Sequence, residues 1–348
     1  MPKAFDLFAL LSGEPIARIA RPDALVHAAT VHGLAGVVTH ELSSKGIDLP
    51  ESARKRLLSE ARSLAGQALK TKMLLARTLK AFAEAGVRPV VLKGYALGAR
   101  TYPDPLLRPT SDVDVLVRSD ELALCEAALL KLGLQPQAEE QRTYAREHHH
   151  HLSYSGPAGL VELHFRPIAG FGASIEWEDL QAPLWNDLEG SPLSYLAPED
   201  ELTYLGVHAA QHAFARVSWL YDLRRFVGAH PELDWEKVVA LASRTGFAVP
   251  LWSALTSAER CFDAEIPPHV LRELSPSLPR ARVLGVLFSE ARLHEGAFTD
   301  DRKLYAAQFL MTATANRAVR FATHHTLRAA KRKVAFRFPD LAPRSWRG

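Results

Sequence analysis

Asp112 and Asp114 stand two positions apart in the short, valine-rich run 111–117, which reads Ser-Asp-Val-Asp-Val-Leu-Val. Such a run predicts a β-strand, and because side chains alternate between the faces of a strand, the two carboxylates are expected on the same side. Like charges on one face repel, and burying both is costly unless a cation compensates them. Carboxylate oxygens without nearby thiolates favour Mg²⁺ or Mn²⁺. An isolated Asp-x-Asp pair also fits a solvent-facing strand edge, so the neighbouring motifs decide.

A third carboxylate, Glu162, occurs in a second predicted strand, 160–166, which follows a Gly-Pro-Ala-Gly turn. Glu162 and His164 share one face of this strand, and the apolar residues between them share the other. Two-metal sites commonly use a further acid for the second ion, and such an acid can accept the proton of an attacking hydroxyl. Asp112, Asp114 and Glu162 are therefore the predicted metal ligands and catalytic residues.

A phosphate-binding turn is predicted at Gly94, where the strand 88–93 turns into a short helix, 95–102. Glycine lacks a Cβ and lets the backbone approach a ligand closely, and the start of a helix presents free N–H groups and a positive dipole end to phosphate. Lys93 and Arg108 can add positive charge beside it. An ordinary turn is the alternative for Gly94 considered alone.

The sequence also contains two groups of closely spaced histidines. Four occupy 148–151 within a predicted strand, 144–155, so alternate rings are expected on opposite faces. His208 and His212 are four residues apart on a predicted helix, which is the spacing of paired zinc ligands, but Ala209 stands where a metalloprotease has glutamate. Metal binding, substrate or phosphate binding and a structural role all stay open. The candidate substrate-pocket residues are His149, His164, His208, His212 and Asp222, the last of which can hold a histidine or an arginine.

The elements that must position these residues divide the chain into a helical beginning, a small α/β centre and a helical second half. Apolar residues recur at helical spacing before residue 86, β-branched runs and glycines mark the centre, and the signals from residue 176 onward are mostly helical. We predict an α+β fold with a small mixed β-sheet. The predicted helices are 22–44, 51–85, 95–102, 121–132, 199–215, 218–229, 235–245, 249–262, 279–294 and 302–335. The predicted parts are a helical N-terminal segment (1–85), a catalytic core (86–196), a helical C-terminal domain (197–335) and a basic tail (336–348).

The composition is that of a globular protein, with 47% hydrophobic and 23% charged residues. Cys125 and Cys261 are the only cysteines and lack CxxC spacing, so a disulfide framework is not expected and a cytoplasmic location fits. No apolar stretch reaches the roughly eighteen residues of a membrane span. Asp6 interrupts the short apolar run within the first fifteen residues, which are expected to form a helix instead of a signal peptide.

The net charge of +3 conceals an asymmetry along the chain. Residues 317–348 contain nine Lys/Arg and one acid, a charge of +8, whereas the remaining residues carry 33 basic and 38 acidic residues, a charge of −5. This segment, with Lys331, Arg332 and Lys333 at its centre, is a candidate contact for a polyanionic partner. The alternative is an ordinary solvated helix face, with the apolar residues of the segment packed on the body.

The motifs in their order along the chain resemble a known family. The runs LKGYALGARTYPDPLLRPTSDVDVLV, VELHF and PEDELTYLGVHAAQHAF resemble the bacterial "uncharacterised nucleotidyltransferase" family of the DNA polymerase beta-like superfamily, over roughly residues 70–230. The resemblance implies a nucleotidyltransferase core that transfers a nucleoside monophosphate from an NTP, with ATP the expected nucleotide, and releases pyrophosphate. Gly94 and Tyr95 occupy the place of the superfamily's Gly-Ser. Because Tyr95 replaces a serine that commonly contacts phosphate, Lys93 or Arg108 can take over that contact.

Two other functions are compatible with the same scaffold. One is transfer of the γ-phosphate, and the other is a non-catalytic nucleotide- or RNA-binding module, which usually lacks one of the three carboxylates. The acceptor of the leading function is a small molecule, a peptide or RNA, and the sequence does not choose among them. Because asparagine at 112 or 114 removes like-charge repulsion, the sequence predicts an unchanged or raised melting temperature for these variants.

Overall fold

The structure is a computed structural model, and it describes residues 3–188, 190–296, 301–312, 314, 316–319 and 321–323. Most of the basic segment 317–348, including Lys331, Arg332, Lys333 and the tail 336–348, lies outside the described residues. The predicted polyanion contact therefore stays a prediction.

A mixed seven-stranded sheet forms the centre of the fold. Its middle strands, β2 and β5, run parallel, β1 is antiparallel to β2 on one side, and β4 is antiparallel to β5 on the other. A separate two-stranded sheet joins β6 to β7. The main strands are β3 (Gln135–Pro136), β4 (His151–Gly156), β5 (Gly159–His164), β2 (Val113–Leu116), β1 (Val90–Val91), β9 (Ser191–Tyr195) and β8 (Leu184–Leu188), in this spatial order, and the small sheet contains β6 (Ile168–Gly170) and β7 (Ala173–Ile175).

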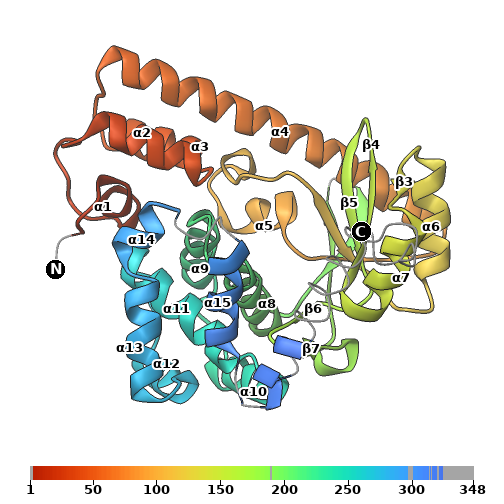
Figure 1. The fold of residues 1–348 in the computed structure, drawn as a ribbon. Coiled ribbons are helices and arrows are strands. Elements are labelled where there is room, and N and C mark those ends of the chain that lie inside the picture. The colour runs from red at the N-terminus through yellow and green to blue at the C-terminus, as the bar shows by residue number, and fades with distance from the viewer. Residues whose placement is uncertain are drawn as a thin grey trace, which may run out of the picture.

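One face of the sheet is closed by helices. The last half of the long helix α4 (Glu51–Glu84), together with α5 (Gly94–Thr101) and α6 (Leu122–Lys131), packs against it, and Figure 1 shows α4 running from the N-terminal helices to the sheet. The alternating residues of β2 and β5 supply the apolar side of this core, as the predicted strand pattern required. Among the apolar residues that β2 and β5 contribute to this core are Val113, Val115, Val161 and Leu163, which share a cluster with Leu75, Leu79, Phe82 and Leu129.

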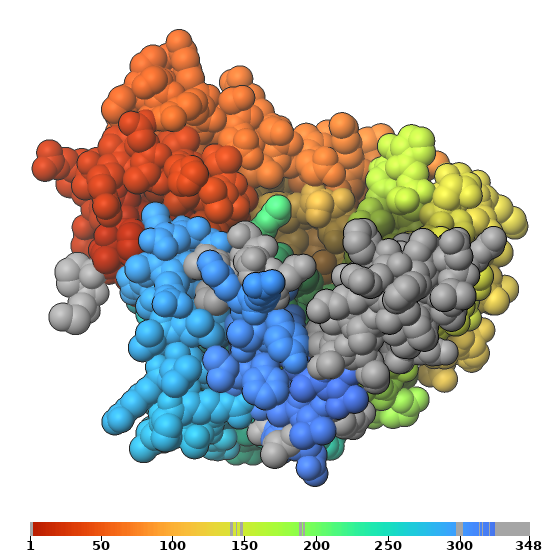
Figure 2. Space-filling model, viewed as in Figure 1, coloured from red at the N-terminus to blue at the C-terminus, as the bar shows by residue number. Residues whose placement is uncertain are grey.

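The helices before and after the sheet share a second apolar core. Residues between Leu7 and Leu57 belong to the same buried cluster as residues of the C-terminal helices up to Met311. Figure 2 shows the N-terminal helices (red) against the segment near residue 290 (light blue), where the rings of Phe5 and His294 stack 4.2 Å apart. The N-terminal helices are α1 (Asp6–Ser12), α2 (Pro22–Val31) and α3 (Ala35–Ser44). The C-terminal helices are α8 (Pro198–Gln211), α9 (Ser218–Ala229), α10 (Trp235–Thr245), α11 (Ala248–Phe262), α12 (Pro268–Leu274), α13 (Leu278–Leu287), α14 (Glu290–His294) and α15 (Asp301–Met311).

The predicted α+β class is confirmed, and so are most of the helices. Five predictions about elements are wrong. The predicted helix 279–294 is divided into α13 and α14, and the predicted helix 302–335 is interrupted after Met311, where α15 ends. Residues 139–148 form helix α7 (Glu139–His148) and not the beginning of a strand, because this run is rich in helix-forming Glu, Arg, Gln and Ala. Residues 184–195, in the part expected to be helical, form the hairpin of β8 and β9. The predicted helix 22–44 is interrupted by Gly33, whose positive φ of 70° ends α2.

The remaining short elements are two 3₁₀ turns, η1 (Pro105–Leu107) and η2 (Trp177–Asp179). Among the residues that the structure describes, no helix combines the length and apolar character that a membrane crossing requires.

The imidazole of His32 joins the N-terminal helices to the C-terminal ones. It is fully buried, its Nε2 lies 2.9 Å from the carbonyl oxygen of His294, and its Nδ1 accepts a hydrogen bond from the backbone N–H of Val217. Burial lowers the pKa of His32 from 6.5 to about 4. This ring is therefore neutral in the folded chain at pH 7.

We expect His32 to make stability depend on pH. Between pH 6.5 and about 4 the unfolded chain binds the proton and the folded chain does not, so stability falls as the pH falls through this window. The loss from this one group amounts to roughly 3 kcal/mol. Urea unfolding at several pH values measures it, and the comparison is with His32→Gln, which does not titrate. Equal pH slopes for the two proteins would contradict the assignment.

Candidate active site

The two aspartates of the Asp-x-Asp motif lie beside one lysine. Asp114 is in β2 and is 2% exposed, while Asp112 precedes the strand and is partly exposed. The Nζ of Lys93 lies 3.1 Å from Oδ2 of Asp114 and 3.5 Å from Oδ2 of Asp112. Both carboxylates therefore lie on the same side of the strand, and a buried ammonium group partly compensates their charge.

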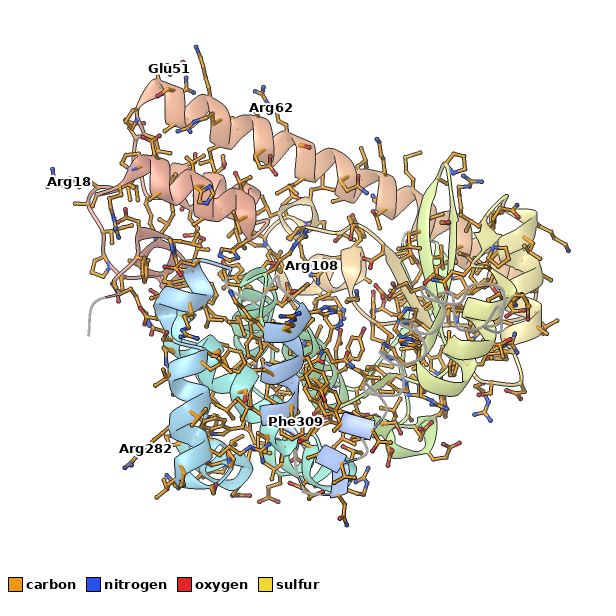
Figure 3. The ribbon with its side chains drawn as sticks, in the orientation of Figure 1. Arg18, Glu51, Arg62, Arg108, Arg282 and Phe309 are labelled. Atoms are coloured by element: carbon orange, nitrogen blue, oxygen red, sulfur yellow. The ribbon has the colours of Figure 1, made fainter. Side chains whose placement is uncertain are left out.

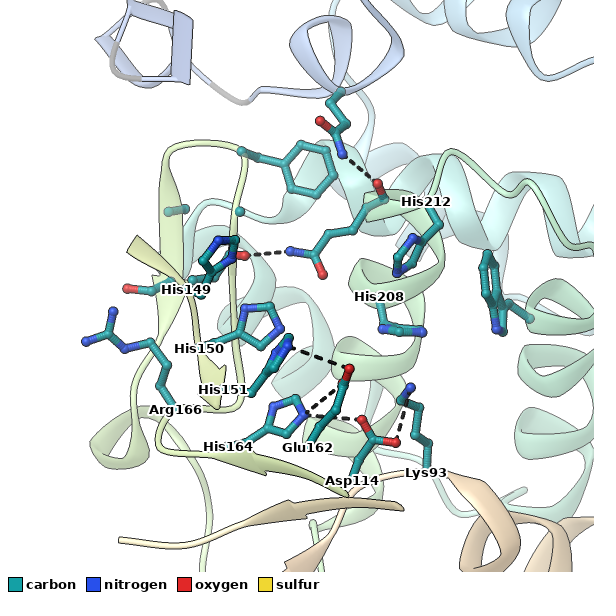
Figure 4. Close-up of a pocket in the computed structure, with 18 of the residues that line it drawn as sticks. Lys93, Asp114, His149, His150, His151, Glu162, His164, Arg166, His208 and His212 are labelled. Carbon is teal, nitrogen blue, oxygen red and sulfur yellow. Dashed lines mark hydrogen bonds and ion pairs between the residues drawn. The ribbon is translucent and has the colours of Figure 1, made fainter. Parts of the chain in front are cut away.

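Glu162 and His164 meet Asp114 from the neighbouring strand. The parallel register of β2 and β5 pairs Asp114 with Glu162, which places the two side chains next to each other on one face. The Nε2 of His164 lies 3.2 Å from Oδ1 of Asp114 and 3.8 Å from Oε2 of Glu162 (Figure 4). Residues from two strands and from the turn before α5 therefore form one cluster.

The charges of this cluster depend on one another. Burial by itself lowers the pKa of Lys93, but the carboxylates of Asp114, Asp112 and Glu162 outweigh burial and raise that pKa above its ordinary value. Burial favours the neutral form of Glu162, yet the neighbouring imidazole of His164 and the ammonium of Lys93 lower the pKa of its carboxyl group. At neutral pH the lysine is cationic and Glu162 is anionic.

The residues of the cluster fit a divalent cation. One ligand atom from each of Asp114, Glu162 and His164 lies within 4.8 Å of the other two. The buried Oδ2 of Asp114 forms an ion pair with Lys93. The same oxygen has no partner with hydrogen-bond geometry among the residues that the structure describes. Asp112 is outside this group of three, and its Oδ2 lies 3.5 Å from Nζ of Lys93. The carboxylate oxygens of this group are the donors that suit Mg²⁺ or Mn²⁺, and the imidazole of His164 lies beside them.

Histidines surround the open pocket above the cluster. Figure 4 shows the rings of His149, His150 and His151 on one side and those of His208, in α8, and His212, directly after it, on the other. The predicted alternation of the first group is wrong, because the chain leaves α7 at residue 148 and enters β4 only at His151. All three rings of this group consequently line the same pocket.

His208 of α8 and His212, which follows this helix, lie against a tryptophan. The ring of His212 is 4.9 Å and that of His208 5.6 Å from the ring of Trp219, and the two imidazoles are 5.0 Å apart. Burial, followed by the charge of Lys93, lowers the pKa of both histidines. The buried Nε2 of His208 has no hydrogen-bond partner among the described residues. This wall therefore offers neutral imidazoles and an aromatic face to a ligand.

The turn predicted to bind phosphate lies next to the carboxylates. Gly94 has a positive φ of 70° at the start of α5, a conformation that favours glycine. No side chain caps this helix, so its first N–H groups lack a capping partner. The ring of Tyr95, in contrast, is 7% exposed and packs in the core on the other face of the sheet. Tyr95 can reach a phosphate only through its backbone.

Arg108 and Asp222 form a buried ion pair at the base of the pocket. The Nε and Nη2 of Arg108 donate to the two carboxylate oxygens of Asp222 at 3.0 and 2.9 Å, and the hydroxyl of Tyr102 donates to Oδ1 at 2.7 Å. Figure 3 shows Arg108 in the interior between the N-terminal and C-terminal helices. Asp222 thus holds an arginine, one of the two partners predicted for it. A phosphate would have to compete with Asp222 for Arg108.

Sequence reasoning did not assign four residues of this region. His150 and His151 belong to the histidine run, but neither was a candidate, and the expected strand placed the ring of His150 away from that of His149. Trp219 and Tyr102 carry no local signal for a pocket or for a buried ion pair. The helix-forming composition of 139–148 was the signal that could have placed the histidine run correctly.

Comparison with known proteins identifies the family. Residues 20–263 match the model of the family described as uncharacterised nucleotidyltransferase. This match covers more than half of the chain, so the chain belongs to that family. No curated protein matches the sequence. A solved structure of the antibiotic-resistance factor ANT(2'')-Ia is similar over 49% of this chain and 89% of its own, with 16% identity and a TM-score of 0.35, which is too low to support a conclusion about this chain.

Proposed function

We propose that this chain is a metal-dependent nucleotidyltransferase, which transfers a nucleoside monophosphate from an NTP to an acceptor and releases pyrophosphate. The observation that carries the proposal is the register of Asp114 with Glu162, which joins two carboxylates and His164 beside Asp112 and Lys93. Membership of the nucleotidyltransferase family supports it. The nucleotide is expected to be ATP, and the acceptor a small molecule, a peptide or RNA.

The residues of the chain have distinct roles in this proposal. Asp112, Asp114 and Glu162 hold Mg²⁺ or Mn²⁺, which stabilises the charge of the triphosphate and of the leaving group when bound. The first N–H groups of α5, beginning at Gly94, and the ammonium of Lys93 bind phosphate oxygens. These contacts hold the triphosphate with its α-phosphorus facing the acceptor.

The transfer itself is a single displacement. The acceptor oxygen forms a bond to the α-phosphorus, and the bond from that phosphorus to the oxygen bridging to the β-phosphate breaks. Pyrophosphate leaves with the electron pair of the broken bond. The proton of the acceptor hydroxyl passes to Glu162, whose carboxylate lies 3.6 Å from Nε2 of His151 and 3.8 Å from Nε2 of His164.

Calorimetry of NTP binding tests the metal requirement. We expect Mg²⁺ or Mn²⁺ to increase the affinity for ATP by about tenfold or more over EDTA. Asp112→Asn should lose this increase, and the matched control Asp120→Asn, an exposed acid after the same strand, should keep it. Equal affinity with and without metal would reject the metal-dependent site.

Labelled nucleotides distinguish the proposed reaction from the alternatives. With α-labelled NTP and mixtures of metabolites, peptides and RNA, the label should move to the acceptor. Label transferred only from the γ-position would instead identify a phosphotransferase. Binding without transfer of either label would leave a nucleotide-binding module.

A further inference from the structure

Three imidazoles form a triangle beside the carboxylate cluster. His151 begins β4, His164 ends β5, the two are cross-strand neighbours, and His150 precedes β4. The ring centroids are 4.8 Å apart for His150 and His151, 5.2 Å for His150 and His164, and 5.0 Å for His151 and His164. One ring nitrogen from each lies within 4.8 Å of the other two.

The size of this triangle is that of three imidazoles around one metal ion. With metal–nitrogen bonds of about 2 Å and tetrahedral angles, the ring centroids of three histidine ligands lie roughly 5 Å from one another. The planes of the rings cross at 77°, 43° and 39°, so the three rings do not form a flat stack. Aromatic stacking therefore does not account for the arrangement.

One nitrogen of each ring in the triangle lacks a hydrogen-bond partner among the residues that the structure describes. The Nδ1 atoms of His150, His151 and His164 are buried and have no hydrogen-bond partner among the described residues. A buried polar atom without a partner is costly, and a bound ion is one way to satisfy it. A nitrogen without a partner on each of the three rings points to a shared ligand.

A carboxylate lies on the other side of two of these rings. Oε1 of Glu162 is 3.6 Å from Nε2 of His151, and Oε2 is 3.8 Å from Nε2 of His164. Histidines that bind a metal usually direct their second ring nitrogen to a carboxylate or carbonyl group. Glu162 is placed to serve as that neighbour and to link the triangle to the carboxylate cluster.

We propose that His150, His151 and His164 bind a divalent cation of the Zn²⁺ class, at a site distinct from the Mg²⁺ or Mn²⁺ site of Asp112, Asp114 and Glu162. Imidazole nitrogens favour Zn²⁺, Co²⁺ and Ni²⁺, whereas carboxylate oxygens favour the harder cations. The three histidines line the pocket, so a fourth position of the ion faces the space open to substrate. Binding of this cation by the three histidines does not require that the chain catalyses nucleotidyl transfer.

Titration of the metal-free full-length chain with Co²⁺ and Zn²⁺ tests this site. In the presence of excess Mg²⁺, we expect tight binding of one Co²⁺ per chain, with the intense visible absorption of a tetrahedral site. His150→Gln should weaken binding by roughly 100-fold or more. The control His208→Gln removes an imidazole from the opposite wall of the same pocket and should leave the affinity unchanged.

Three further measurements decide the outcome. Circular dichroism of the metal-free variants establishes that they fold, and His151→Gln replaces His150→Gln should the latter unfold. Asp112→Asn should keep Zn²⁺ affinity while losing the effect of Mg²⁺ on ATP binding, which separates this site from the proposed function. Wild-type affinity in the folded histidine variants, or absence of tight Co²⁺ binding to the native chain, would overturn the proposal.

Discussion

Asp114→Asn is expected to lower the rate of nucleotidyl transfer by on the order of 10³-fold or more, which corresponds to about 4 kcal/mol of transition-state stabilisation. The carboxylate of Asp114 is at the centre of the site, because it contacts Lys93 and His164 and belongs to the group of ligand atoms that fits a divalent cation. Asparagine keeps the shape but removes the charge. A large loss of kcat is therefore expected without displacement of neighbouring groups.

The same substitution is expected to destabilise the metal-free protein. From the sequence alone, the loss of repulsion between two acids predicts the opposite sign. The structure changes the balance, because the ammonium of Lys93 is only 12% exposed and has its shortest ion pair with Asp114. Removing that partner leaves a buried cation undercompensated, at a cost of roughly 1–3 kcal/mol. Asp112→Asn should cost less, since Asp112 is more exposed and lies 3.5 Å from the lysine.

Urea unfolding in EDTA and an assay with α-labelled NTP measure the two effects separately. The control is Asp120→Asn, which makes the same chemical change at a side chain that is 74% exposed. It should alter neither quantity. If Asp114→Asn instead raises the stability of the metal-free chain, repulsion between the acids dominates and Lys93 does not compensate them.

The strand that carries the acids could be predicted because its pattern is local. Alternation in β2 directs Val113 and Val115 into the core and Asp114 to the other face, and the same rule applies to Glu162 in β5. The pairing of β2 with β5 could not be predicted from local alternation. It depends on a register between segments that are almost fifty residues apart, which no local pattern specifies.

The histidine run shows where local reasoning failed. Its β-strand character was inferred from flanking residues, but the helical preference of 139–148 prevails, and the chain turns before His151. Three consecutive rings consequently enter one pocket, a result that neither a strand nor a helix period predicts. The triangle with His164 depends further on the hairpin register.

Replacing Arg108 is expected to destabilise the fold itself. Arg108 is 4% exposed and Asp222 3% exposed, and two hydrogen bonds of 2.9–3.0 Å join them. Arg108→Met leaves a buried carboxylate whose only other side-chain donor is the hydroxyl of Tyr102 among the described residues. Breaking one half of a buried ion pair costs roughly 3–5 kcal/mol. The same change at the surface, Arg54→Met, breaks an exposed pair with Glu51 and should leave the free energy of unfolding nearly unchanged.

A double-mutant cycle in the absence of nucleotide distinguishes a structural pair from a phosphate ligand. If Arg108 serves the ion pair, Asp222→Asn also destabilises the chain, because the guanidinium then loses its buried counter-charge. The combined Arg108→Met and Asp222→Asn variant leaves neither charge, so its loss of unfolding free energy should be smaller than the sum of the single losses. If Arg108 serves the triphosphate, as the sequence predicted, Arg108→Met should weaken ATP binding. The two single variants should then unfold with nearly wild-type free energy, and the double variant should show the sum of their small losses. Because Asp222 lies on α9 and Arg108 on the loop before β2, strong coupling would mean that the C-terminal helices fix the position of the loop that leads into the Asp-x-Asp strand.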